Sequence, residues 1–235
     1  MNVQEQLSKI TEDILEHLKD ELLSIILYGS AVRGEYVEKK SDINLLIIVD
    51  KNDLTPYKLL WNVIDKLNKT RINLVIMSPK YITKSLDTFP LEFLDMLHFS
   101  QTLYGKPIDN FVGHISKNSI RLACERELKV KLIALKSIYL RSKGKSKEIE
   151  NVLFHSLTSL RVILLGLNYL KKGLTQSGTV ELSKDAEIDT GLIRKINELR
   201  KGDIKLKSDE LLSTFEHYIT EMELLANWLD DFKFE

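Results

Sequence analysis

A glycine, a serine and an aspartate are spaced near the start of the chain as a phosphate and metal site would require. Gly29 and Ser30 directly follow the apolar run at 22–28, and Asp42 directly precedes the apolar run at 43–49. Glycine lets the backbone approach a phosphate closely, and free N–H groups at the start of a helix favour an anion. A carboxylate is an oxygen ligand of the kind that Mg²⁺ binds. The pattern indicates a site for a triphosphate and a metal ion, although a Gly-Ser pair after a strand is also common in plain turns.

The residue two places after Asp42 is an asparagine. Residues two apart on a strand point to the same face, so Asp42 and Asn44 should project together beside the Gly-Ser turn. Two carboxylates there would hold two metal ions, about 4 Å apart, that activate a hydroxyl group and stabilise a leaving pyrophosphate. Asparagine offers a neutral carbonyl oxygen instead. The site is therefore predicted to carry less negative charge than two metal ions need.

Short apolar runs and the helices between them must position these side chains. Strands covered on both faces are predicted at 22–28, 43–49 and 72–77. Residues 3–20 have the apolar spacing of an amphipathic helix. Two more helices are expected to begin at the caps Thr55 and Ser78, each of which is followed by a proline. Helices and strands thus alternate through the first part of the chain, as in an α/β sheet domain.

Long helical patterns replace the strands after about residue 110. They lie at 115–142, 147–172, 190–201 and 208–230. Ser146 suits the N-cap of the second of these helices and Gly173 its C-cap, and residues 171–189 form the longest irregular segment. This arrangement is typical of a helical bundle. The chain is therefore predicted to have a sheet domain at 1–110 and a helical bundle domain at 111–235.

The composition is that of a globular protein without a general charge bias. Of the 235 residues 43% are hydrophobic, and 34 basic side chains balance 34 acidic ones, so neither nucleic acid nor a membrane is an expected partner. The most apolar long stretch, 152–170, contains charged and polar residues and is expected to be a buried core helix rather than a membrane span. The single cysteine, Cys124, cannot form a disulfide within the chain, and the N-terminus has no signal-peptide pattern. A cytoplasmic location is therefore expected.

Charge is divided unevenly within the predicted bundle. Residues 114–147 have 10 basic and 2 acidic side chains, whereas residues 208–235 have 1 basic and 8 acidic ones. The favoured interpretation is that these two helices are neighbours that neutralise each other. The alternative is that the basic helix faces a phosphate or a nucleic acid.

Residues 29–49 resemble the DNA polymerase β-like nucleotidyltransferase superfamily, which includes kanamycin nucleotidyltransferase. Its motif is Gly-Ser, a spacer, then Asp-x-Asp at the start of a hydrophobic strand, with a third acidic residue on a later strand. The stretches "GSAVRGEY" and "SDINLLIIV" are similar to it, and Gly29, Ser30 and Asp42 match. The segment 89–108 and the helices after it look like those of bacterial nucleotidyltransferase-domain proteins with a C-terminal helical bundle. The resemblance thus covers most of the chain.

The resemblance implies a fold, a reaction and a set of site residues. The fold would be α+β, a nucleotidyltransferase-type mixed sheet flanked by helices and followed by an α-helical bundle. The reaction would move a nucleoside monophosphate from a nucleoside triphosphate (NTP) to a hydroxyl group of an unknown small molecule or protein, with Mg²⁺ as the cofactor and a homodimer as the expected assembly. The implied catalytic residues are Asp42, Asn44 and Asn73, with Asp42 as the metal ligand. The implied nucleotide-binding residues are Gly29, Ser30 and Arg33, although Arg33 would equally pair with an acid such as Glu35 or Glu38.

Asn44 and Asn73 depart from the motif, because both occupy positions that are acidic in the superfamily. The loss of two carboxylates should weaken Mg²⁺ binding and impair catalysis, although one metal held by Asp42 and the triphosphate remains compatible with the site. The acids that would compensate are Glu35, Glu92 and Asp95, and a base from the helical domain would be Glu125 or Glu127. The alternative function is a catalytically inactive nucleotide-binding or protein-interaction regulatory module of the same fold.

Overall fold

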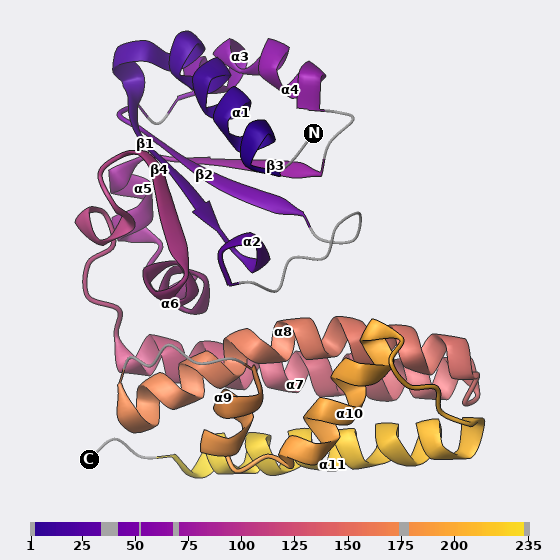
Figure 1. The fold of residues 1–235 in the computed structure, drawn as a ribbon. Coiled ribbons are helices and arrows are strands. Elements are labelled where there is room, and N and C mark those ends of the chain that lie inside the picture. The colour runs from indigo at the N-terminus through magenta and orange to yellow at the C-terminus, as the bar shows by residue number, and fades with distance from the viewer. Residues whose placement is uncertain (1–2, 34–41, 52, 68–70, 174–178, 233–235) are drawn as a thin grey trace. The chain divides into compact units, whose positions relative to one another are not determined.

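The computed structural model describes residues 3–33, 42–51, 53–67, 71–173 and 179–232 (Figure 1). It divides into two compact units, Met1–Ile115 and Ser116–Glu235, and we describe each unit by itself. The boundary expected from the sequence, between residues 110 and 111, falls just before this division.

Unit 1 is built around a four-stranded mixed sheet in the order β3-β2-β1-β4. Its strands are β1 (Leu22–Tyr28), β2 (Ile43–Val49), β3 (Ile72–Met77) and β4 (Ser100–Gly105). β1 runs antiparallel to both β2 and β4, and β2 runs parallel to β3. The first three strands have the bounds that their apolar runs predict, and the mixed sheet is confirmed.

The strand β4 is not predicted by the apolar pattern. Most of its side chains are exposed, and only Ser100 and Leu103 are partly buried. It lies at the edge of the sheet against β1. Gly105 ends the strand with φ +77°, and a Cβ there would come within 2.0 Å of the Leu23 carbonyl oxygen. An exposed edge strand needs no continuous apolar run, which is why the sequence did not indicate it.

Helices cover both faces of this sheet (Figure 1). They are α1 (Val3–Leu18), α3 (Thr55–Leu59), α4 (Trp61–Leu67), α5 (Pro79–Lys84) and α6 (Pro90–His98), with short 3₁₀ turns at Lys19–Glu21 and Ile108–Asn110. Ile10 and Ile14 of α1 and Val63 of α4 pack into one core with the buried Ile25 and Leu45 of the sheet. α5 and α6 lie on the opposite face. The covered sheet explains why the strands are apolar on both sides.

Two helix starts in unit 1 were predicted from cap residues, and one of them is confirmed. The Ser78 hydroxyl accepts a hydrogen bond from the Tyr81 backbone N–H at 3.2 Å and caps α5. Thr55 is wrong as a cap because it is already the first residue of α3. Its backbone N–H instead donates to the Asp53 carboxylate at 2.8 Å.

Unit 2 consists of helices in the part that the structure describes. They are α7 (Lys117–Ser142), α8 (Ser146–Lys172), α9 (Thr179–Asp185), α10 (Thr190–Lys201) and α11 (Ser208–Asp231). The expected irregular segment at 171–189 is wrong in part, because it contains α9. Gly173 ends α8 as predicted, with its N–H bonded to the Tyr169 carbonyl, but Ser146 is the first residue of α8 rather than its cap.

The central helix of unit 2 is α8, which contacts α7, α9, α10 and α11. Among the described residues it is the one helix long and apolar enough to cross a membrane, but 65% of its most apolar window is buried inside the protein. Leu153, Leu160 and Leu164 are fully enclosed. This is the buried core position that the sequence predicts for 152–170.

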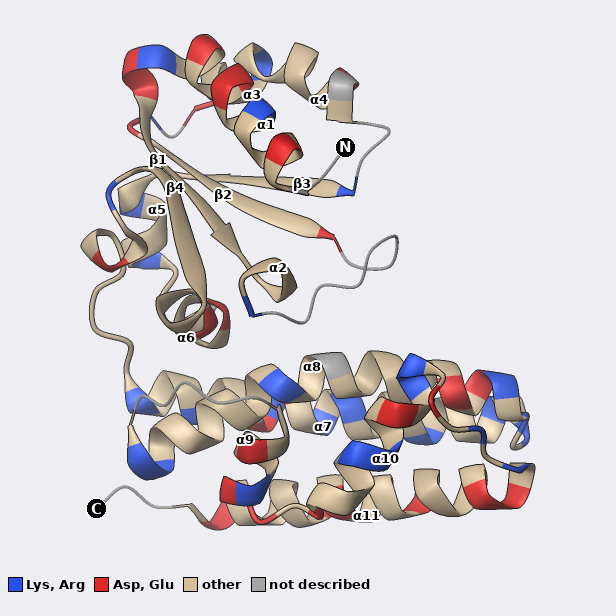
Figure 2. Ribbon diagram, in the orientation of Figure 1, with Lys and Arg blue, Asp and Glu red and all other residues tan. Residues whose placement is uncertain are grey.

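The basic and acidic helices of unit 2 are α7 and α11, and they lie side by side (Figure 2). The Lys129 ammonium contacts the Asp230 carboxylate at 2.7 Å, and Lys136 pairs with Glu223. The favoured interpretation, that the two charged segments neutralise each other, is therefore confirmed.

Candidate nucleotide and metal site

The predicted phosphate turn lies at the end of β1 and packs against β2. Gly29 has φ +84°, and its carbonyl oxygen accepts hydrogen bonds from the backbone N–H groups of Val32 and Arg33 at 3.1 and 3.3 Å. These bonds close the short helix α2 (Ser30–Arg33). A Cβ at position 29 would come within 3.0 Å of the Asn44 side-chain nitrogen. The turn and the strand face that carries Asn44 are therefore in direct contact.

The two asparagines at the usually acidic positions contact each other. Asn44 and Asn73 are register partners on the parallel strands β2 and β3. The Asn73 side-chain amide donates to the Asn44 side-chain oxygen at 3.2 Å. Tyr28 lies opposite Asn44 on β1, and burial raises the pKa of its phenol, so Tyr28 adds no charge at neutral pH. The face is neutral where the motif has carboxylates.

Asp42 stands at the start of β2 and pairs with Arg71, which stands at the start of β3. The Arg71 Nε–H donates to the Asp42 carboxylate at 2.8 Å, and the side chains are 53% and 44% exposed. The Ile43 N–H also donates to the Arg71 carbonyl at 2.7 Å. Sequence reasoning missed Arg71. The signal that points to it is that neighbouring parallel strands place their first residues together, so residues before the runs at 43–49 and 72–77 should meet.

Arg33 follows the Gly-Ser turn and pairs with an acid of α6. Its guanidinium contacts the Asp95 carboxylate at 2.7 Å, and the two side chains are only 11% and 10% exposed. Arg33 was predicted either to bind a phosphate or to pair with an acid. This contact shows an ion pair, and its partner is Asp95. The predicted partners Glu35 and Glu38 lie outside the described residues.

Comparison with known proteins finds a family match within the first unit. Residues 7–93 match the family model of the nucleotidyltransferase domain. The match spans Gly29, Asp42, Asn44 and Asn73, and the resemblance to the DNA polymerase β-like superfamily is confirmed.

Solved structures extend the comparison over the whole chain. The spectinomycin adenyltransferase AAD(9) from Enterococcus faecialis, solved with ATP and spectinomycin, has a TM-score of 0.57 at 15% identity, covering 98% of this chain and 100% of that chain. This likeness shows that the fold is shared. A nucleotidyltransferase-like protein from Exiguobacterium sibiricum 255-15 has a TM-score of 0.36 at 13% identity, with 94% and 74% coverage. The search of curated proteins found no match.

The acids predicted to replace the missing carboxylates are exposed or paired with basic side chains where the structure describes them. Glu92 is exposed on α6, and Asp95 is committed to the Arg33 pair. Glu125 and Glu127 belong to α7 of unit 2, where Glu125 bonds to Arg121 and Lys129 and Glu127 contacts Arg126. Within the described ranges no group of three or more acidic, histidine or cysteine side chains converges as a metal site. Among the three implied catalytic positions, Asp42 alone carries a carboxylate, and two metal ions would need more.

Proposed function

We propose that this protein binds an NTP through its nucleotidyltransferase domain and transfers the nucleoside monophosphate to a hydroxyl group of a small molecule. One observation carries the proposal: the Gly29 turn packs against Asn44 of β2, and Asp42 directly precedes that strand. The backbone proposed to bind phosphate then contacts a residue two positions from the carboxylate proposed to bind a metal. The family match of residues 7–93 supports the reaction class.

The metal in this proposal is a single divalent ion, expected to be Mg²⁺, held by Asp42 and by oxygens of the triphosphate. Such an ion would supply positive charge that neutralises the phosphates. The ion pair between Asp42 and Arg71 must break before Asp42 can bind a metal ion. This costs little, because an exposed ion pair contributes only about 0–1 kcal/mol. Arg71 is then released beside the phosphates and donates to them. Asn44 and Asn73 supply neutral amides and no metal charge, so turnover should be slow.

The acceptor is proposed to be a small molecule with free hydroxyl groups. The spectinomycin adenyltransferase of similar fold was solved with such a molecule and with ATP. In the proposed step the acceptor oxygen attacks the α-phosphorus, the bond from that phosphorus to the β-phosphate oxygen breaks, and pyrophosphate leaves. The hydroxyl proton goes to a base, for which Glu125 and Glu127 stay predictions, as do the homodimer and the cytoplasmic location.

Melting temperatures test nucleotide binding. The protein is heated with ATP, GTP, CTP or UTP, each with and without Mg²⁺. A nucleotide at 100 times its dissociation constant stabilises the folded state by about 2.7 kcal/mol. We expect Mg²⁺-dependent stabilisation by at least one NTP, loss of the Mg²⁺ dependence in Asp42→Asn, and no change in the matched control Asp109→Asn, which alters an exposed aspartate of the same unit. If no nucleotide raises the melting temperature, the proposal is wrong.

A second function is favoured by the Asn44–Asn73 contact, and it is a catalytically inactive nucleotide-binding or protein-interaction regulatory module. Pyrophosphate release from ATP with spectinomycin as the probe acceptor separates the two, using the wild type and the Asn44→Asp/Asn73→Asp double variant. The proposed enzyme predicts that the double variant binds Mg²⁺ more tightly and releases pyrophosphate faster. If the nucleotide affinity of both proteins is the same with and without Mg²⁺, the inactive module is favoured.

A further inference from the structure

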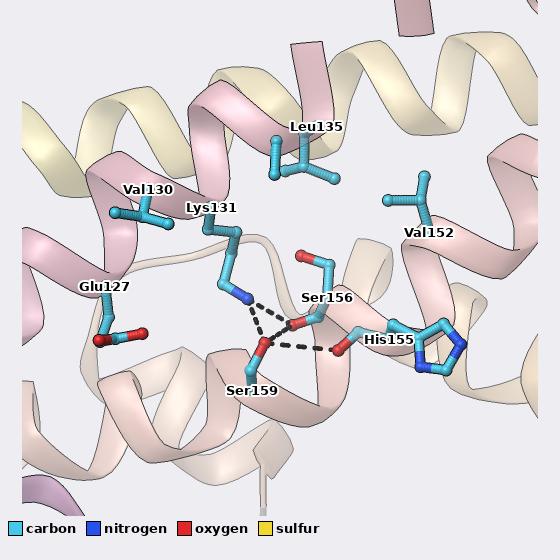
Figure 3. Close-up of a pocket in the computed structure, with 9 residues that line it drawn as sticks. Glu127, Val130, Lys131, Leu135, Val152, His155, Ser156 and Ser159 are labelled. Carbon is cyan, nitrogen blue, oxygen red and sulfur yellow. Dashed lines mark hydrogen bonds between the residues drawn. The ribbon is translucent and has the colours of Figure 1, made fainter. Parts of the chain in front are cut away.

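A pocket of about 270 Å³ lies between α7 and α8 of unit 2 (Figure 3). Its lining comes from these two helices alone. The apolar part of the lining is formed by Val130, Ala134, Leu135 and Val152. The pocket uses none of the residues proposed for nucleotide binding, so what it binds goes beyond the proposed function.

One cation occupies the polar end of this pocket. The Lys131 ammonium reaches from α7 to α8, where it donates to the Ser156 carbonyl oxygen at 3.1 Å and to the Ser159 hydroxyl oxygen. Both acceptors are neutral. Among the described residues no carboxylate forms an ion pair with Lys131. The acid on the rim, Glu127, contacts Arg126 and attracts Lys131 only through space. Burial lowers the pKa of Lys131 to about 8 because desolvation penalises the charged form.

The hydroxyl groups near Lys131 have their own partners. The Ser156 hydroxyl shares a 2.8 Å hydrogen bond with the Tyr218 phenol. The Ser159 hydroxyl is a donor within reach of two backbone carbonyls, that of Ser156 at 3.2 Å and that of His155 at 3.4 Å. An ammonium group has three donors, and two of them are used here. Lys131 therefore keeps one N–H and a positive charge to offer to a ligand.

We propose that the pocket binds a small aliphatic carboxylate, with the carboxylate on Lys131 and the hydrocarbon chain against the apolar walls of α7 and α8. A single negative charge matches the single ammonium, and it meets less repulsion from Glu127 on the rim than a more highly charged anion would. The volume equals that of about nine water molecules, since each occupies about 30 Å³ in the liquid. A six-carbon monocarboxylate is of that size.

Calorimetric titration of the full chain with three probes tests the two parts of this recognition. The probes are hexanoate, acetate, which keeps the charge without the chain, and 1-hexanol, which keeps the chain without the charge. We expect hexanoate to saturate one site and the other two probes to bind at least tenfold more weakly. Absence of saturable hexanoate binding overturns the proposal, and so does equal affinity for acetate or for 1-hexanol.

Three variants locate the binding on the pocket. Lys131→Met keeps the stem and removes the charge, and Ala134→Phe fills the apolar part from an exposed position while Lys131 stays. Each should weaken hexanoate binding at least tenfold. The matched control is Lys136→Met, which removes a 57% exposed lysine of the same helix that does not line the pocket, and it should bind hexanoate as the wild type does. Circular dichroism verifies that the variants fold, and wild-type affinity in folded Lys131→Met and Ala134→Phe would place the ligand elsewhere.

Discussion

Replacing Gly29 with alanine should strain the turn and disturb the neighbouring strand face at the same time. A residue with a Cβ at φ +84° costs roughly 1–2 kcal/mol, because the side chain approaches the following carbonyl. The new Cβ would also lie 3.0 Å from the Asn44 side-chain nitrogen. Moving Asn44 away breaks its 3.2 Å bond with Asn73, which is worth about 1 kcal/mol. The expected loss of stability in unit 1 is about 2–3 kcal/mol.

Hydrogen exchange of the β1 and β2 amides measures this loss in unit 1 alone. A loss of 2 kcal/mol should speed their exchange about thirtyfold, since 1.4 kcal/mol corresponds to a factor of ten. The matched control is Gly113→Ala, where φ lies outside the left-handed region and the new Cβ would be 3.7 Å from a Leu86 methyl. That substitution should leave exchange unchanged or slow it. Gly105→Ala should be worse than Gly29→Ala, because its Cβ would lie 2.0 Å from the Leu23 carbonyl oxygen.

Two results would contradict the role given to the Gly29 turn. If Gly29→Ala exchanges as slowly as Gly113→Ala, the turn does not need a left-handed residue and does not pack on Asn44. If Gly29→Ala speeds exchange but leaves the Mg²⁺-dependent melting shift with NTP unchanged, the turn is structural and does not hold phosphate.

Further predictions concern buried polar groups. Asp95→Leu should cost about 3 kcal/mol in urea unfolding because it leaves the Arg33 guanidinium buried without its carboxylate, and adding Arg33→Met should restore part of that loss. Lys131→Met should be more stable than the wild type at pH 7 by up to about 3 kcal/mol, because folding lowers the pKa of Lys131 from 10.5 to about 8. Between pH 8 and 10.5 the Lys131 side chain is protonated in the unfolded chain and neutral in the folded one, so the stability of the wild type rises with pH. The difference in stability between Lys131→Met and the wild type should therefore shrink across that range, as measured by urea unfolding. Asn168→Leu should cost about 1–3 kcal/mol in urea unfolding, since the fully buried Asn168 amide donates to the Leu182 carbonyl at 3.1 Å and joins α8 to α9.

Periodicity predicts the elements of this fold where one physical constraint dominates. The central strands β1 and β2 are buried on both faces, so nearly every position is apolar, and the runs at 22–28 and 43–49 mark their ends. The run at 72–77 marks β3 in the same way, although β3 is an edge strand and is only partly buried. β4 and α9 lack such a constraint. β4 is held mainly by backbone bonds at the sheet edge, and α9 is a short helix whose position depends on its contacts with α8 and α10. Contacts distant in sequence cannot be inferred from a local pattern.

The candidate site also has features that the local sequence predicts and contacts that it does not. The apolar run predicts that Asp42 directly precedes β2 and that Asn44 lies within it, and the Gly-Ser pair predicts the turn. The partners of the charged groups come from other elements, Arg71 from the start of β3 and Asp95 from α6. Asp95 is 62 residues from Arg33, so only the packing of α6 brings the two together.

The amide pair at Asn44 and Asn73 explains how this site keeps its shape when no metal neutralises it. Carboxylates at both positions would be about 5 Å apart on neighbouring strands and would repel each other by about 3 kcal/mol at an effective dielectric constant of 20. Such a face needs a cation to be stable. Two amides attract each other instead, through the 3.2 Å hydrogen bond, and the Gly29 turn rests on the Asn44 side chain. Under the proposed function, amides in place of carboxylates should reduce metal affinity, while their hydrogen bond supports the Gly29 turn. Nucleotide binding should then persist where turnover is weak.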